Sequence, residues 1–282
     1  MNGPIPTTMR AVLLTGFGGY DRLDLRSDVA VPFPGPGEVL IRIGAAGVNN
    51  TDINTRIGWY SKDVAASTDA GGDTGFSEAG DDGWSGAAFS FPRIQGADCC
   101  GHIVACGDGV PASRLGERVL VDPLLHLADG SVQYFGSECD GAFAEYTRVP
   151  SRNAVAVNSA LCDAELTSFP CAYSAAENIL HRTAPTAGET VLVTGASGGV
   201  GSAAVQLAKR RGARVIAVTG ADKAAQVRDL GADRLVDRGA DLRAELGRDA
   251  VDVVVDIVGG PQFPALLDCL RPGGRYGSSG AI

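Results

Sequence analysis

The chain has 282 residues, of which 45% are hydrophobic and 20% are charged, a composition typical of globular proteins and a length that suits two domains. Its formal net charge of −9 disfavours a broad role on nucleic acids or membrane surfaces, because no basic stripe in the sequence would neutralise phosphates. The seven cysteines form no Cys-x-x-Cys pair and predict reduced thiols in a cytoplasmic protein.

Residues 8–150 carry short apolar runs between turns, which is the pattern of β-strands. Because the runs are short and turns recur between them, the pattern predicts an antiparallel barrel or sandwich. The expected strands cover residues 10–14, 39–43, 103–105, 118–121 and 142–149.

One segment of this half, residues 63–89, has no proline and no hydrophobic periodicity, and it is rich in glycine, serine and aspartate. A loop of this length is usually either functional or disordered. Two interpretations therefore stay open. The segment is a disordered or solvated surface, or it forms a lid on the substrate side.

From Cys162 onward the hydrophobic period changes, and helices alternate with strands. The apolar residues between Leu166 and Leu180 predict a helix. Alternating strands and helices predict an α/β fold with a doubly wound parallel sheet. Its strands are expected at residues 191–194, 214–218, 234–236, 251–256 and 274–276.

The most informative motif is the glycine-rich turn that follows the first of these strands. The glycines permit a tight turn, and the helix that begins there offers free N–H groups and the positive end of its dipole to an anion. A strand, a glycine turn and a helix in this order predict a dinucleotide-binding unit and therefore an oxidoreductase. The expected cofactor-binding residues are Gly195, Ala196, Ser197, Gly198, Gly199, Val200 and Gly201.

Other motifs fit the same glycines. Gly195-x-Ser197-x-Gly199 has the spacing of a hydrolase nucleophile elbow, but all three histidines of the chain precede Ser197, whereas that mechanism needs one after it. The short-chain dehydrogenase pattern also requires Tyr-x-x-x-Lys, which none of the six tyrosines provides. A glycine-rich turn that binds no ligand stays open as the third interpretation.

Three stretches together resemble the medium-chain dehydrogenase/reductase superfamily: residues 35–52, residues 141–150, and the glycine turn with its later segments 230–233 and 270–275. The resemblance implies a GroES-like domain at residues 1–155, which carries segment 63–89 as an insertion. It also implies a Rossmann domain at residues 156–282.

Within the superfamily, the chain resembles the zinc-free, quinone oxidoreductase-like branch. Asn49 stands where zinc-dependent relatives have a cysteine, and Ala97 stands where they have a histidine. Cys171 matches the third ligand position, but one thiolate does not make a zinc site. The four closely spaced cysteines of the relatives' structural zinc lobe are also absent, so no metal is expected.

Without zinc, the resemblance implies hydride transfer to a quinone, an enone or a related small carbonyl. In this branch a tyrosine faces the substrate, and Tyr60 matches it as a donor to the developing oxyanion. Asn49 would line the same pocket. A second tyrosine of some relatives is Asn54 here, and ordinary packing at a loop edge stays open for Tyr60.

The end of the second strand of the dinucleotide-binding unit bears on the choice of cofactor. NAD enzymes place an acidic residue there, whereas this chain has Thr219 and Gly220, with Lys223 just beyond. This pattern favours NADP(H), although Asp222 would suit NAD(H). Arg238 is a second possible phosphate partner, and Val258 is a further expected cofactor contact.

The predicted function is NADPH-dependent reduction without zinc. An alcohol or ketone dehydrogenase of the same fold, or a nucleotide-binding protein without turnover, is the alternative. Relatives usually continue past Gly274-Arg275 to a sixth strand, so the resemblance implies a C-terminally incomplete Rossmann domain. The strand at residues 274–276 would then be an exposed edge, and the homodimer expected of the family would be impaired.

Overall fold

The computed structural model describes residues 4–80, 89–127 and 130–279. The chain divides into two compact units, Met1–Cys171 and Ala172–Ile282. Residues 156–171, which we assigned to the second domain, therefore group with the first unit. In the described part of the chain, no helix is long and apolar enough to cross a membrane.

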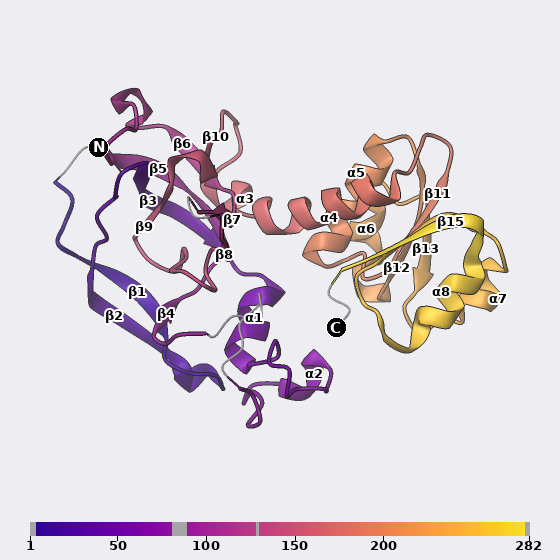
Figure 1. Ribbon diagram of the computed structural model, residues 1–282. Helices are drawn as coiled ribbons and strands as arrows, with labels where there is room; N and C mark the ends of the chain where they lie inside the picture. Colours follow the sequence, from indigo (N-terminus) through magenta and orange to yellow (C-terminus); the bar gives the residue numbers. More distant parts are fainter. Residues whose placement is uncertain (1–3, 81–88, 128–129, 280–282) are drawn as a thin grey trace. The chain divides into compact units, whose positions relative to one another are not determined.

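The first unit is built from antiparallel strands, as the short apolar runs predict (Figure 1). Strand β3 (Glu38–Gly47) is covered on both faces, because Val39 and Ile41 pack into one apolar cluster and Leu40 into another. A three-stranded sheet has the order β2 (Leu23–Ala30), β1 (Thr8–Leu14), β4 (Arg93–Ile94). A five-stranded sheet has the order β10 (Ala154–Ala156), β6 (Arg118–Val121), β5 (Asp98–Cys106), β3 (Glu38–Gly47), β9 (Tyr146–Pro150), and β7 (Leu124–His126) pairs with β8 (Val132–Tyr134).

Helix α1 (Asn50–Ile57) follows β3, and its ends are set by local sequence. Asn49 occupies the N-cap position, and its backbone N–H donates to Asp52 Oδ2 at 2.8 Å, as in a capping box. Gly58 ends the helix in the left-handed conformation with φ of 76°, which only glycine adopts readily. The turn after Gly58 carries Tyr60.

Residues 63–80 pack on the C-terminal end of α1 and contain the short helix α2 (Thr68–Gly71). The backbone N–H of Phe76 donates to the Ile57 carbonyl at 2.9 Å, and the Trp59 indole N–H donates to the Ala66 carbonyl at 3.0 Å. The expectation of a wholly irregular loop was wrong here, because these contacts link residues too far apart in sequence to form a periodic pattern. Residues 81–88 of the segment lie outside the described residues.

The predicted helix around Leu166–Leu180 is two helices, α3 (Asp163–Leu166) and α4 (Pro170–Thr183). Pro170 is the first residue of α4, where the lack of a backbone N–H costs no hydrogen bond. The proline therefore separates the two helices. Three single turns of 3-10 helix complete the first unit: η1 (Tyr20–Arg22), η2 (Ala112–Arg114) and η3 (Ser151–Asn153).

The second unit contains the predicted parallel sheet, and the order of its described strands is β13 (Arg234–Asp237), β12 (Arg214–Thr219), β11 (Thr190–Val193), β14 (Val251–Asp256), β15 (Leu270–Ser278). In β11, Val191 and Val193 belong to one apolar cluster and Leu192 to another, so the strand is covered on both faces. Between the strands lie α5 (Gly199–Arg210), η4 (Ala221–Lys223), α6 (Ala224–Asp229), α7 (Leu242–Leu246), η5 (Gly260–Gln262) and α8 (Phe263–Cys269).

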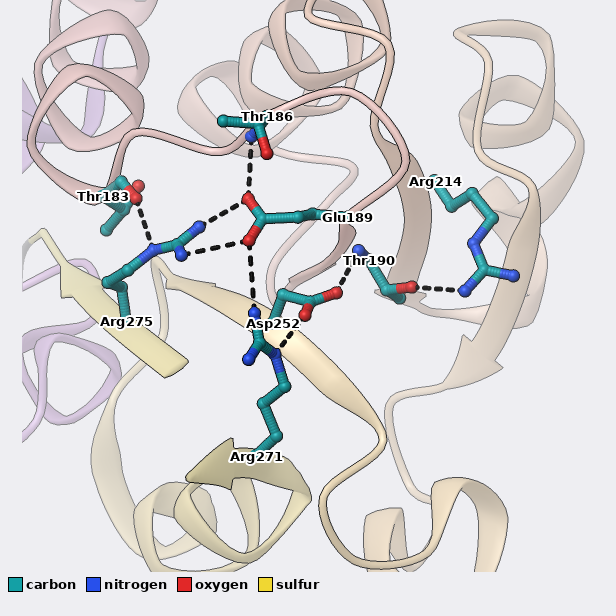
Figure 2. A network of polar contacts seen from close by, with 8 residues as sticks. All are labelled: Thr183, Thr186, Glu189, Thr190, Arg214, Asp252, Arg271 and Arg275. Carbon is teal, nitrogen blue, oxygen red and sulfur yellow. Dashed lines mark hydrogen bonds and ion pairs between the residues drawn. The ribbon is translucent and has the colours of Figure 1, made fainter. Parts of the chain in front are cut away.

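A polar network joins β15 to the start of β11 (Figure 2). Arg275 donates to both carboxylate oxygens of Glu189, at 3.1 and 2.6 Å, and Arg271 reaches the same carboxylate and that of Asp252. The Arg275 guanidinium, together with the Thr186 backbone N–H, lowers the pKa of Glu189 to about 2. Both arginines of the segment 270–275 therefore bind acidic residues at the start of β11 and on β14.

Candidate functional site

The glycine turn of the second unit needs glycine for its shape at two positions. Gly195 has φ of 56°, in the left-handed region. A Cβ added at Gly201 would lie 2.7 Å from the Gly195 carbonyl carbon and 2.8 Å from Ala196 Cα, so a side chain there collides with backbone. Helix α5 therefore begins directly against the turn.

The surface of this turn is open to a ligand. Gly198 and Gly199 are exposed at the start of α5, whose first backbone N–H groups have no partner within the helix. Such a helix start favours an anion, and the pyrophosphate of a dinucleotide fits both the charge and the glycine surface. Ala196 is buried, with its backbone N–H donating to Val218 at 3.1 Å, whereas Ser197 and Val200 are half-buried.

Val258 lies beside the same turn, although it is distant in sequence. Its Cγ2 is 3.1 Å from the position of a Cβ added at Gly195, and 61% of the residue is exposed. The predicted cofactor contacts around residues 195–201 and Val258 are thus brought together. Sequence reasoning missed Asp256. This buried carboxylate lies two residues before Val258 and accepts the Val258 backbone N–H at 3.0 Å.

The end of β12 has charged groups on both sides of Gly220. A Cβ added there would lie 2.6 Å from Asp222 Oδ1 and 3.7 Å from Arg238 Nε. The Arg238 backbone N–H also donates to the Thr219 carbonyl, at 3.0 Å. Lys223 is exposed and ends η4, with its backbone N–H donating to the Gly220 carbonyl at 3.1 Å.

In the first unit, Asn49 is held between two buried carboxylates. Its side-chain Nδ2 donates to Asp98 Oδ2 at 2.9 Å, and its backbone N–H donates to Asp52. Asp52 also accepts the Gly96 backbone N–H at 3.1 Å, and Asp98 accepts the Cys171 backbone N–H at 2.8 Å. Burial raises the pKa of Asp52 to about 6 and also raises the pKa of Asp98.

Tyr60 is half-buried, and its hydroxyl donates to Thr51 Oγ1 at 3.1 Å. Burial raises the pKa of Tyr60, so the phenol stays protonated at neutral pH and can act as a hydrogen-bond donor. The hydroxyl would have to turn from Thr51 to donate to a substrate. The Trp59 ring contacts the Tyr60 ring edge to face, with centroids 5.5 Å apart.

A second tyrosine, which sequence reasoning missed, belongs to the same cluster. Tyr134 donates its O–H to Cys171 Sγ at 3.5 Å. Burial raises the pKa of Cys171 to about 11 and raises the pKa of Tyr134 as well. Both groups are therefore protonated at neutral pH. No local sequence signal links Tyr134 to Cys171, because the contact joins a hairpin strand to the start of α4.

The donors at these positions do not fit a catalytic zinc. Ala97 has no ligand atom, and the Asn49 amide is engaged with Asp98. Zinc sites in proteins use cysteine, histidine and carboxylate ligands. Among the described residues, no group of three or more such side chains is arranged to hold a metal ion.

Comparisons with known proteins agree with the two units. Residues 35–159 match the family model of the alcohol dehydrogenase GroES-like domain, and residues 199–282 match that of the zinc-binding dehydrogenases. The chain is 30% identical to the acryloyl-coenzyme A reductase of Metallosphaera sedula, over 97% of this chain and 77% of that protein. It is 28% identical to the quinone oxidoreductase of Homo sapiens, over 97% of this chain and 74% of that protein.

A solved structure gives the same result. The chain is 47% identical to an alcohol dehydrogenase candidate from Sinorhizobium meliloti 1021, with a TM-score of 0.85 over 99% of this chain and 77% of the other. Sequence, fold and relatives therefore agree. The chain belongs to the medium-chain dehydrogenase/reductase superfamily, in its quinone oxidoreductase-like branch, and is an NAD(P)H-dependent oxidoreductase.

Proposed function

We propose that this protein reduces a quinone, an enone or a related small carbonyl with NADPH and without zinc. The observation that carries the proposal is the cluster around Asn49. Where zinc-dependent relatives have ligands, this chain has an amide bound to Asp98, the side chain of Ala97, and a protonated thiol at Cys171. These groups form hydrogen bonds and do not provide the ligands that a zinc ion acting as a Lewis acid needs.

Without zinc, the protein has to supply only orientation and hydrogen bonds to the substrate. A nicotinamide cofactor supplies the hydride, and a conjugated acceptor spreads the resulting charge over several atoms. Tyr60 would donate its O–H to the oxygen on which charge develops. Asn49, fixed at its backbone by Asp52 and at its amide by Asp98, would present a rigid polar wall to the substrate.

NADPH is the cofactor that the end of β12 favours. Thr219 and Gly220 supply no carboxylate for a ribose hydroxyl, and the Arg238 guanidinium lies beside Gly220. Asp222 at the same glycine favours NADH instead. We infer that the cation dominates, because a 2′-phosphate carries more charge than a hydroxyl and Lys223 adds a second cation within the same turn.

The remaining finer assignments are also proposals. The net charge of −9 and the free cysteines support a cytoplasmic enzyme that acts on small molecules and not on nucleic acid. A boundary near residue 155 between a substrate domain and a cofactor domain follows from the resemblance to the family. A homodimer is the family's expected assembly, and size-exclusion chromatography with light scattering would test it.

Oxidation of NADPH, followed at 340 nm with a panel of substrates, tests the proposed function. Reduction of quinones or enones, with simple alcohols inert in the reverse direction with NADP⁺, would support it. Turnover of simple alcohols would favour the alcohol dehydrogenase alternative. Tight cofactor binding with no turnover of any acceptor would favour the non-catalytic alternative.

A further inference from the structure

Asp256 is a buried carboxylate that the proposed chemistry does not use. It is the last residue of β14 and is 1% exposed. A carboxylate is costly to bury unless its charge is compensated by hydrogen bonds or a counter-charge. Among the ion pairs of the described residues, none includes Asp256, so its compensation comes from hydrogen bonds.

Two neighbouring strands donate to this carboxylate. Thr194, which follows β11, donates its hydroxyl to Oδ1 at 2.5 Å. Tyr276, on β15, donates its hydroxyl to Oδ2 at 2.5 Å. Burial alone would raise the pKa of Asp256, but the donors from Thr194, Tyr276 and the following backbone hold it below its usual value. The group is therefore charged at neutral pH.

The segment after β14 is bound to the side chains of Asp256 and Thr194. The backbone N–H groups of Val258 and Gly259 donate to Asp256 Oδ1, each at 3.0 Å. The N–H of Ile257 donates to Thr194 Oγ1, also at 3.0 Å. Three successive amides thus point inward. The segment 257–259 is held as a turn, with no backbone donor left for a ligand.

The exposed part of this segment includes an apolar side chain. In the described residues, no hydrogen bond reaches the carbonyls of Ile257 and Val258. The Val258 side chain is exposed and leans on the turn at Gly195. The surface next to the glycine turn therefore offers a Val258 methyl group in a fixed position.

The sheet order indicates which part of a dinucleotide would meet this surface. In a doubly wound sheet the cofactor crosses where the strand order reverses, which lies here between β11 and β14. The adenosine ribose is bound at the end of the strand after the first helix, which is β12. The nicotinamide half of the cofactor must then extend over the end of β14, where residues 257–259 lie.

We propose that Asp256 is a positioning residue that, together with Thr194, fixes residues 257–259 as the wall of the site for the nicotinamide half of the cofactor. Asp256 thus binds the hydroxyls of Thr194 and Tyr276 and also two amides of the following turn. This inference rests on the proposed use of a nicotinamide cofactor. It adds that residues 257–259 already hold this conformation before the cofactor binds, so less conformational entropy is lost on binding.

The test compares Asp256→Leu and Thr194→Val with the parent in the absence of substrate. Leucine has no acceptor for the Val258 and Gly259 amides, whereas asparagine would keep one. The dissociation constant of NADPH, measured by calorimetry, should rise about 10-fold or more in both variants, the effect of losing a charged or buried hydrogen bond. The dissociation constant of adenosine 2′,5′-bisphosphate, which lacks the nicotinamide half, should stay within about twofold. In the free protein, hydrogen exchange at residues 257–259 should become faster.

Two controls separate positioning from general loss of stability. Thr194→Ser keeps the hydroxyl and should restore NADPH affinity. Glu189→Gln weakens the network at the start of β11, shown in Figure 2, and should lower the melting temperature without changing NADPH affinity. If Asp256→Leu does not fold, the comparison of Thr194→Val with Thr194→Ser decides the question.

Three outcomes would overturn the inference. Unchanged NADPH affinity in Thr194→Val or in a folded Asp256→Leu would refute it while leaving the proposed function intact. Equal loss of affinity for adenosine 2′,5′-bisphosphate would show a general collapse of the site. A parent protein that binds neither NADPH nor NADH would refute the proposed function and this inference together.

Discussion

Replacing two glycines of the same motif should have two different effects. A Cβ at Gly201 would lie 2.7 Å from the Gly195 carbonyl carbon, whereas ordinary contacts begin at 3.4 Å. The Gly195 carbonyl oxygen would lie nearer still, so the backbone of the turn and that of α5 would have to separate by roughly 1 Å or more. The cost is at or above the upper end of the ~1–3 kcal/mol range for overpacking, because neither partner is a flexible side chain. Gly198 is different, because a Cβ there would lie 3.5 Å from the nearest atom, the Gly195 carbonyl oxygen.

Gly201→Ala should thus lower the free energy of unfolding of the cofactor-free protein by about 3 kcal/mol or more and also weaken NADPH binding. Gly198→Ala should leave that free energy within about 0.5 kcal/mol, because its backbone has φ of −80° and ψ of 171°, but should weaken NADPH binding by covering an exposed surface of the turn. Urea unfolding followed by circular dichroism measures the first quantity, and calorimetric titration measures the second. A Gly201→Ala protein as stable as the parent would refute the reasoning, as would a Gly198→Ala protein that binds NADPH normally.

Three further predictions concern catalysis, cofactor choice and stability. Tyr60→Phe should lower turnover about 10-fold or more and leave the dissociation constant of NADPH unchanged, whereas equal turnover would assign Tyr60 to packing. Arg238→Ala should weaken NADPH binding by ~1 kcal/mol or more with little effect on NADH, and Lys223→Ala should act in the same direction but less, which a fluorescence titration with both cofactors would check. Glu189→Gln should lower the free energy of unfolding by ~1–2 kcal/mol at pH 7, since both side chains of the pair are partly screened by solvent. Because the pKa of Glu189 falls to about 2 on folding from its ordinary 4.5, that difference should be complete above about pH 4.5 and shrink as the pH approaches 2, and a constant difference between pH 7 and pH 3 would contradict it.

The fold could be predicted because its signals are local. The strand at Val191–Val193 is an apolar run, and the glycines after it fix a turn whose shape no other residue permits. The alternation of strands and helices then predicts a doubly wound parallel sheet, which the structure confirms. The break between α3 and α4 was also local, since Pro170 could have been used to place it.

The candidate site was predicted only in part, because its hydrogen bonds join residues far apart in sequence. Asn49 was singled out by its position in a motif, but nothing local shows that Asp98 holds its amide. Tyr134 and Asp256 were missed for the same reason. Asp256 ends its strand directly after three consecutive valines, and such a residue is a signal that deserved a functional interpretation.

The contacts of residues 63–80 show the same limitation. Composition predicted an irregular loop, yet the close approach of Ala79 to Gly58, where an added Cβ would lie 2.5 Å from the Ala79 side chain, depends on tertiary packing. Whether the segment acts as a lid stays a prediction. Shortening it should change the substrate KM more than NADPH affinity if it does.

The claim that hydride transfer proceeds without zinc is tested most directly by measuring activity against metal content in one preparation. The protein would be dialysed against a chelator, analysed for zinc by mass spectrometry, and assayed with NADPH and its best quinone or enone before and after zinc is added back. The account predicts full activity at far less than one zinc per chain and no gain on adding zinc. Activity that rises in proportion to bound zinc, up to one ion per chain, would contradict it.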